Sequence, residues 1–173
     1  FRTNEGSTDY ATIPEVTLSG DFKVSMLLQC DTSANTAFIG GGSSTRGYQL
    51  INNNLELSNG GGGVNFAGAL SGIASGYLFV VDFERISGVL TATVGGDAYV
   101  GSAVNSADYV IDTLLASQNQ ANNTKGILAN LKIWDNGTLV RDYPINDGKN
   151  ILANVATALG SELDGLTYAL TTA

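Results

Sequence analysis

Histidine is absent from this chain of 173 residues, and cysteine and proline are scarce. No catalytic mechanism here can use an imidazole. Cys30 is the single cysteine, so it can form no disulfide within the chain, and it has no histidine that could activate it as a nucleophile. These absences argue against a disulfide-stapled scaffold and against enzymes that depend on histidine or cysteine.

Positive charge is also scarce. Eight lysines and arginines stand against sixteen aspartates and glutamates, which gives a formal net charge of −8. A nucleic-acid-binding surface neutralises phosphates with clustered basic residues, and the sequence shows no such cluster. We therefore expect no nucleic-acid partner. No apolar run approaches the ~20 residues of a membrane-spanning helix, so we also expect no membrane insertion.

What the chain does contain indicates β-structure. Hydrophobic residues make up 43% of the sequence and glycine occurs 22 times, so short apolar segments alternate with turn signals. The length favours a single domain over residues 1–173. The start at Phe1, without a methionine, is expected of a processed protein or of a domain excised from a larger one.

Alternation of apolar and polar residues predicts many short strands. The longest run, 77–86, places Phe79, Val81 and Phe83 on one face. In the run 20–30, Cys30 is in phase with four apolar residues, which predicts a buried thiol. The other predicted strands before the late hairpin are 37–39, 47–51, 55–57, 64–66, 89–94, 99–100 and 110–116, and residues 166–170 are predicted to form a closing strand.

The most informative stretch is residues 126–148, which contains a predicted hairpin. Its two β-rich runs flank Asn136-Gly137, and Asn-Gly is the strongest short-range signal for a tight hairpin turn. A second turn is expected at 146–148. One segment departs from the β-pattern, because apolar residues recur at helical spacing over 151–159, which predicts one short helix there.

Four segments carry a further pattern: residues 8–14, 20–25, 80–95 and 126–137. In this order they resemble four motifs of the concanavalin A-like lectin/glucanase superfamily, and within it of the laminin-G-like and pentraxin-like domains. Those motifs are the opening "D-Y-hydrophobic-x-I-P", the "G-D-F-T-V-S" strand, the strand pair that ends in "V-x-G", and the "G-x-I-x-x-I-x-I-W-D" hairpin. The resemblance implies an all-β fold, a two-sheet antiparallel jelly-roll sandwich with one concave and one convex sheet. There are two departures: Tyr77 stands where the family usually has tryptophan, and no disulfide staples the fold.

The loops, rich in glycine, asparagine, alanine and threonine, look more like those of bacterial or viral members of this superfamily than of animal ones. Such domains are common in phage tail structures and in secreted bacterial proteins. The resemblance therefore implies an extracellular or virion-surface location.

Asp82 and Glu84 are candidates for chemistry, since two residues of spacing in a strand places both carboxylates on one face, about 6–7 Å apart along the chain. Paired carboxylates carry out glycoside hydrolysis. The simpler interpretation is a solvated strand face with Arg85 or Lys132 as nearby counter-charges, and we favour it. A second acidic pair, Glu162 and Asp164, lacks the third carboxylate of the jelly-roll glucanase signature.

Trp134 is the single tryptophan and directly precedes Asp135 and Asn136. An exposed indole beside amide and carboxylate groups could hold a sugar ring, whereas most tryptophans are largely buried. Both interpretations stay open.

A Ca²⁺ site is a further open hypothesis. Asp31, Asp97, Asp108 and Asp112 are expected at strand ends or in loops, where oxygen ligands of Ca²⁺ often lie, but no motif fixes a ligand set. The glycine-rich segments 40–42 and 60–63 complete no phosphate-binding motif and are interpreted as turns.

The sequence thus predicts a non-catalytic recognition module that binds a cell-surface glycan or a similar host receptor, as part of a phage tail or a secreted bacterial protein. The candidate ligand-binding residues are Trp134, Asp135, Asn136, Asp82 and Glu84. One alternative is a structural virion domain that forms a homotrimer without a ligand. Another is a glycoside hydrolase or polysaccharide lyase; we assign no catalytic residue.

Overall fold

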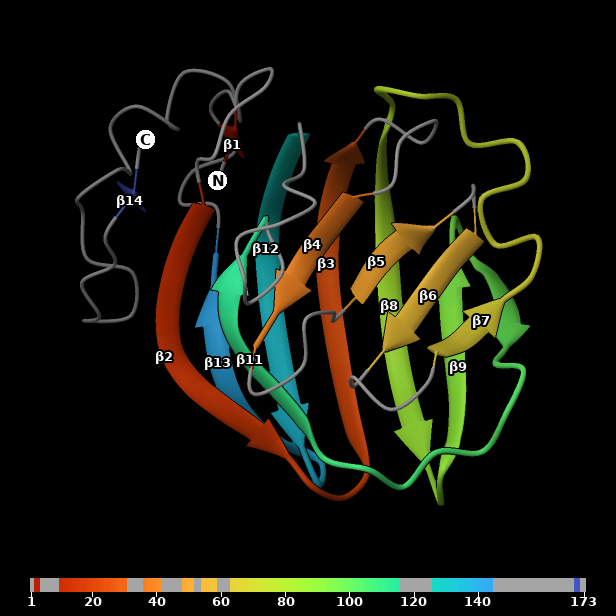
Figure 1. Ribbon diagram of the computed structural model, residues 1–173, viewed down its shortest axis with the longest axis vertical. Helices are drawn as coiled ribbons and strands as arrows, with labels where there is room; N and C mark the ends of the chain where they lie inside the picture. The colour runs from red at the N-terminus through yellow and green to blue at the C-terminus, as the bar shows by residue number, and fades with distance from the viewer. Residues whose placement is uncertain are drawn as a thin grey trace.

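The computed structural model describes residues 2–3, 10–30, 36–41, 48–51, 54–58, 63–115, 126–144 and 170–171. All regular elements among them are β-strands, and every strand pair is antiparallel. The strands form two sheets that stack face to face (Figure 1). The predicted all-β, two-sheet antiparallel sandwich is confirmed. The helix predicted at 151–159 and the turn predicted at 146–148 lie outside the described residues.

Sheet A has the strand order β1-β12-β3-β8-β9-β10, and β13 pairs with β12. It comprises β1 (Arg2–Thr3), β3 (Phe22–Cys30), β8 (Leu78–Ile86), β9 (Val89–Val94), β10 (Asp97–Val100), β12 (Gly126–Asp135) and β13 (Thr138–Tyr143). The predicted strands 20–30, 77–86 and 89–94 agree with β3, β8 and β9 to within two residues. In the part of the chain with assigned structure, no helix is long and apolar enough to cross a membrane.

Sheet B has the order β14-β2-β11-β4-β5-β6-β7. It comprises β2 (Tyr10–Leu18), β4 (Thr36–Gly40), β5 (Tyr48–Ile51), β6 (Asn54–Ser58), β7 (Gly63–Phe66), β11 (Tyr109–Leu114) and β14 (Leu170–Thr171). In Figure 1 sheet B lies in front of sheet A, so the inner faces of the two sheets enclose the core.

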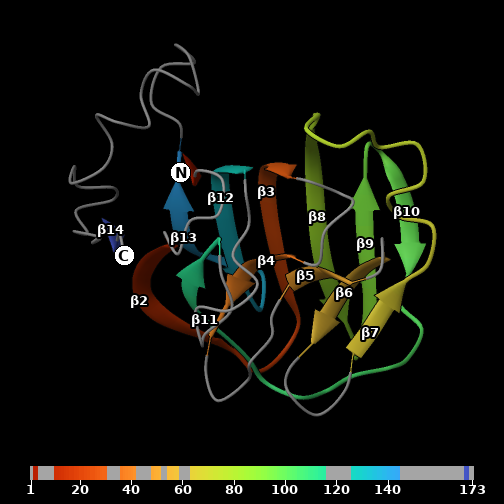
Figure 2. The same cartoon turned by 45° about the horizontal axis from the view of Figure 1, so that its top comes forward.

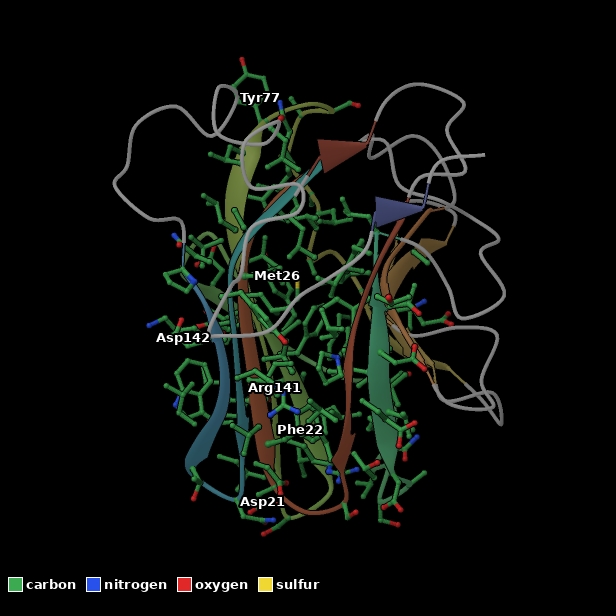
Figure 3. The ribbon with its side chains drawn as sticks, turned by 90° about the vertical axis from the view of Figure 1, so that its left-hand side faces the viewer. Asp21, Phe22, Met26, Tyr77, Arg141 and Asp142 are labelled. Carbon is green, nitrogen blue, oxygen red and sulfur yellow. The ribbon has the colours of Figure 1, made fainter. Side chains whose placement is uncertain are left out.

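The core follows the two-residue period of the strands. On β3, Phe22, Val24, Met26 and Leu28 are buried and the residues between them are not. Met26 points between the two sheets in Figure 3. The predicted inward face of β8 is confirmed, since Phe79, Val81 and Phe83 are buried, and the ring of Phe83 lies 5.7 Å from that of Phe66 on sheet B. The side chain of Cys30 lies outside the described residues.

Gly101 and Ser102, which directly follow β10, bridge the two sheets at one side of the sandwich. Strands β7 and β10 lie at this side (Figure 2). The Gly101 amide donates to the Leu90 carbonyl of sheet A at 2.8 Å, and the Ser102 amide donates to the Asn65 carbonyl of sheet B at 2.9 Å. A Cβ atom on Gly101 would lie 2.3 Å from the Val64 side chain. Only glycine therefore lets the chain run this close to both sheets.

Arg85 is the unexpected member of the core. The period of β8 that buries Phe83 also turns Arg85 inward, and its side chain is only 2% exposed. Its guanidinium donates to three backbone carbonyls: Nε to Gly20 at 2.7 Å, Nη1 to Ala107 at 2.5 Å and Nη2 to Leu18 at 3.2 Å. The expectation that Arg85 is a counter-charge for Asp82 and Glu84 is therefore wrong, because it faces the opposite side of the sheet.

Two aromatic rings flank the guanidinium of Arg85. Its central carbon lies 4.8 Å from the ring centroid of Phe22 and 5.6 Å from that of Tyr109, and the two rings meet edge to face at 5.5 Å. Such cation–π contacts are strongest where water is excluded. Arg85 thus joins β8 of sheet A to the ends of β2 and β11 of sheet B.

Arg85→Met should lower the free energy of unfolding by at least about 3 kcal/mol, because three carbonyls in a buried site lose their donor. Urea unfolding followed by circular dichroism measures the loss. The matched control is Lys132→Met, which removes an exposed ion pair and should cost less than about 1 kcal/mol. Equal losses in the two variants would contradict the anchoring role of Arg85.

Burial raises the pKa of Tyr109 from 10.0 to about 12, and the positive charge of Arg85 partly opposes the rise. The folded state therefore holds the phenol proton more tightly than the unfolded state does. The resulting contribution to the free energy of unfolding is fully present below pH 10 and is lost as the pH rises to about 12. The shift corresponds to roughly 2–3 kcal/mol. Tyr109→Phe should remove this part of the alkaline loss, which urea unfolding of both proteins between these pH values would measure. Identical pH profiles would contradict the assignment to Tyr109.

Candidate functional site

Three of the five predicted ligand-binding residues share one surface. We call it the outer face of sheet A, meaning the side chains of β3, β8, β9, β12 and β13 that point away from the core. Trp134, Asp82 and Glu84 lie on it, opposite in phase to buried residues such as Ile133 and Phe83. The strand registers arrange this face in two neighbouring cross-strand rows. These rows are Trp134, Lys23, Glu84 and Thr91, and Lys132, Ser25, Asp82 and Thr93.

Lys23 lies at the centre of these rows. Its ammonium nitrogen is 3.1 Å from Oδ2 of Asp82 and 5.9 Å from the ring centroid of Trp134. It therefore contacts a carboxylate on one neighbouring strand and the indole on the other. Trp134 itself is half-buried, and no described element covers this face of the sheet.

The second lysine of this face is engaged in the same way. Lys132 Nζ lies 3.2 Å from Oδ2 of Asp142 on β13, and Asp142 points outward in Figure 3. The predicted counter-charge Lys132 thus pairs with Asp142, while the partner of Asp82 is Lys23. Among the described residues, the Oδ1 atoms of Asp82 and Asp142 are shielded from solvent without a hydrogen-bond partner.

Glu84 differs from both aspartates. It stands opposite Lys23 in the register of β3 and β8, and its residue is exposed. Across the described parts of the chain, neither ion pair of this face includes the Glu84 carboxylate, and no hydrogen bond to it occurs. This carboxylate is available to a ligand.

Asp135 and Asn136 lie at the end of the sheet, beside the β2–β3 turn. Asn136 and Gly137 have φ values of 47° and 79°, which confirms the tight Asn-Gly turn predicted from the sequence. The Asn136 amide donates to the Asp21 carbonyl at 2.7 Å, and its side-chain Nδ2 donates to Oδ1 of Asp135 at 3.2 Å. Asp21 marks this lower end of the sandwich in Figure 3. Both residues are engaged in holding the turn.

The candidate Ca²⁺ ligands are spread over the fold. Asp97 begins β10 and Asp108 directly precedes β11, as expected, but Asp112 lies inside β11, where it accepts a hydrogen bond from the Thr113 hydroxyl at 2.7 Å. In the described ranges, no three histidine, cysteine or acidic side chains come close enough to hold one metal ion. Asp31 lies outside those ranges.

Lys23 is the residue that the sequence interpretation missed. A signal for it existed, because Lys23 alternates with buried Phe22 and Val24 and so had to face outward. Its contact with Asp82 depends on the pairing of β3 with β8, which are far apart in the sequence.

No known protein-family profile matches the chain, and no curated protein matches it in sequence. Among solved structures, the chain is similar to the crystal structure of chicken galectin 2, with 8% sequence identity and a TM-score of 0.44. The similarity covers 75% of this chain and 100% of the galectin chain. A likeness of this degree assigns no function, so the proposals below rest on the side chains of sheet A.

Asn136→Ala should lower the free energy of unfolding by about 1 kcal/mol more than Asn136→Gly, because only glycine adopts the positive φ of this position without strain. Both variants lose the same contacts with Asp135, so their difference isolates the backbone effect. Urea midpoints of the two variants give the comparison. Equal midpoints would show that the turn tolerates a side chain here.

Proposed function

We propose that the chain is a non-catalytic recognition module that binds a glycan on the outer face of sheet A. The observation that carries the proposal is the half-buried indole of Trp134 in register with Lys23 and Glu84. A pyranose ring has an apolar face that can stack on an indole and a rim of hydroxyls that need polar partners. The outer face offers both kinds of group within two adjacent rows.

The polar groups suit hydroxyl recognition. Ser25, Thr91 and Thr93 supply hydroxyls that can donate or accept, while Lys23 donates and Glu84 accepts. A duplex or RNA would require clustered positive charge, and the chain carries a net charge of −8. A sugar chain lying across the strands is the ligand that fits this mixture best.

The arrangement gives no support to a glycan-cleaving role for Asp82 and Glu84. Both carboxyls of a glycosidase must reach the same glycosidic bond, one as acid and one as base or nucleophile. Here Asp82 is bound to Lys23, whereas Glu84 is exposed. We therefore assign Glu84 to ligand binding and Asp82 to the support of Lys23 at the same site.

The biological setting is part of the same proposal. The loop composition and the resemblance of the sequence to secreted and phage-borne jelly rolls support a domain of a phage tail or secreted bacterial protein. Its ligand would then be a host cell-surface glycan or a similar receptor, met at an extracellular or virion surface.

A second candidate function, assembly without a ligand, is favoured by one observation. Four exposed aliphatic residues lie near the β8–β9 turn of sheet A: Ile86 and Val89 pair across it, Val104 lies against Gly88, and Val100 ends the neighbouring β10; they are 56%, 43%, 71% and 67% exposed. Aliphatic side chains gathered on a surface can mark a contact with another chain. Light scattering tests this directly, since a homotrimer is expected for the structural role and a monomer would count against it.

A glycan-array screen with and without Ca²⁺ tests the recognition role. Binding should weaken at least about tenfold in Trp134→Ala, because the stacking surface is lost. Trp134 is the single tryptophan, so its fluorescence should also change as the bound glycan is titrated into the wild-type protein.

The matched control is Tyr77→Ala, an aromatic residue that is 68% exposed at the end of the sandwich opposite Asp21 (Figure 3). It should bind like the wild type. Unchanged binding in Trp134→Ala, with the fold intact by circular dichroism, would refute the assignment of the site.

A further inference from the structure

The described charges on the outer face of sheet A do not balance. Lys23 is paired with Asp82, and Lys132 is paired with Asp142. Glu84 then remains as one carboxylate without a cation. Among the described charges of this face, Glu84 is therefore the carboxylate that a cationic group of a ligand can pair with.

Two further basic residues with described side chains, Arg85 and Arg141, do not face this surface. Arg85 adjoins Glu84 in sequence but points into the core, where its guanidinium is held by carbonyls. Arg141 stands opposite Ile133, whose side chain faces the core, and its Nη1 donates to the Val140 carbonyl at 2.8 Å. The net charge of −8 further favours the approach of a cation over that of an anion.

The indole and the unpaired carboxylate are well spaced for one ligand. Trp134 and Glu84 belong to the same row and are separated by the single strand that carries Lys23. Two inter-strand spacings place their backbones about 10 Å apart, a span within the length of a disaccharide. A sugar stacked on Trp134 would thus bring a neighbouring sugar over Glu84.

We infer that this site selects glycans that carry a free amine, such as a 2-amino-2-deoxy sugar, whose ammonium group binds Glu84. This inference rests on the proposed glycan-binding function. Acidic sugars are disfavoured, because a ligand carboxylate over β8 would meet both Asp82 and Glu84, and the neighbouring Lys23 is already paired with Asp82. Neutral sugars could stack on Trp134 but would leave the charge of Glu84 unmatched.

The test uses an array that carries oligomers of glucosamine, of N-acetylglucosamine and of galacturonic acid, at a pH where the glucosamine amines are protonated. The wild-type protein should prefer the glucosamine oligomer. Glu84→Gln should weaken binding of that oligomer about two- to fivefold, the usual range for an exposed ion pair. Added salt should reduce the preference, since exposed charge pairs are screened.

Glu15→Gln is the matched control, because it removes the same charge from an exposed position on β2 of the opposite sheet. It should leave the preference unchanged. Loss of the preference in Glu84→Gln but not in Glu15→Gln supports the inference. Equal effects of the two variants would overturn it, since they would show a response to net charge alone.

The outcomes also separate this inference from the proposed function. An array with no bound glycan of any kind contradicts the recognition role, and the amine selectivity with it. Binding confined to neutral or acidic glycans, and weakened by Trp134→Ala, overturns the amine selectivity while it supports the recognition role.

Discussion

The buried guanidinium of Arg85 is the constraint on which the arrangement of the sandwich depends. Its donors reach Leu18, Gly20 and Ala107, so one side chain of sheet A holds the backbone where two strands of sheet B end or begin. A buried charge is tolerated only when its hydrogen-bonding groups are matched. The end of β2, the turn to β3 and the approach to β11 must therefore all be in place together, which couples the registers of the two sheets.

The same register creates the outer face. Because side chains alternate along β8, an inward Arg85 requires an outward Glu84, and with it an outward Asp82. A slip by one residue would place Glu84 in the core and would remove the Arg85 donors from three carbonyls, and both changes are costly. The buried Arg85 and the outward-facing Asp82 and Glu84 thus depend on the same register of β8, even though they lie on opposite sides of the sheet.

Local patterns made much of this fold predictable. The alternation of Phe79, Val81 and Phe83 gave the inner face of β8, and Asn136-Gly137 gave the hairpin, because both signals act between near neighbours in the sequence. Contacts across strands distant in sequence were not accessible in this way. The pairing of β3 with β8, which joins Lys23 to Asp82, depends on the whole topology. The burial of Arg85 was missed for a related reason: arginine is rarely buried unless it is paired, and its carbonyl partners come from distant segments.

A solvated carboxylate needs no partner, so an exposed Glu84 would by itself say little about function. Its position in the same row as Lys23 and Trp134 makes it a candidate ligand-binding group. Glu84 lies opposite Lys23 of the neighbouring strand, and Lys23 already forms an ion pair with Asp82. On the far side of Lys23 lies Trp134, the one side chain of the row with a large apolar surface. Since β3, β8 and β12 are each paired on both sides, these groups project from well-supported strands, and a ligand would find them largely preorganised. Since no described element covers this face, discrimination between ligands would come from charge and stacking more than from enclosure by the described strands.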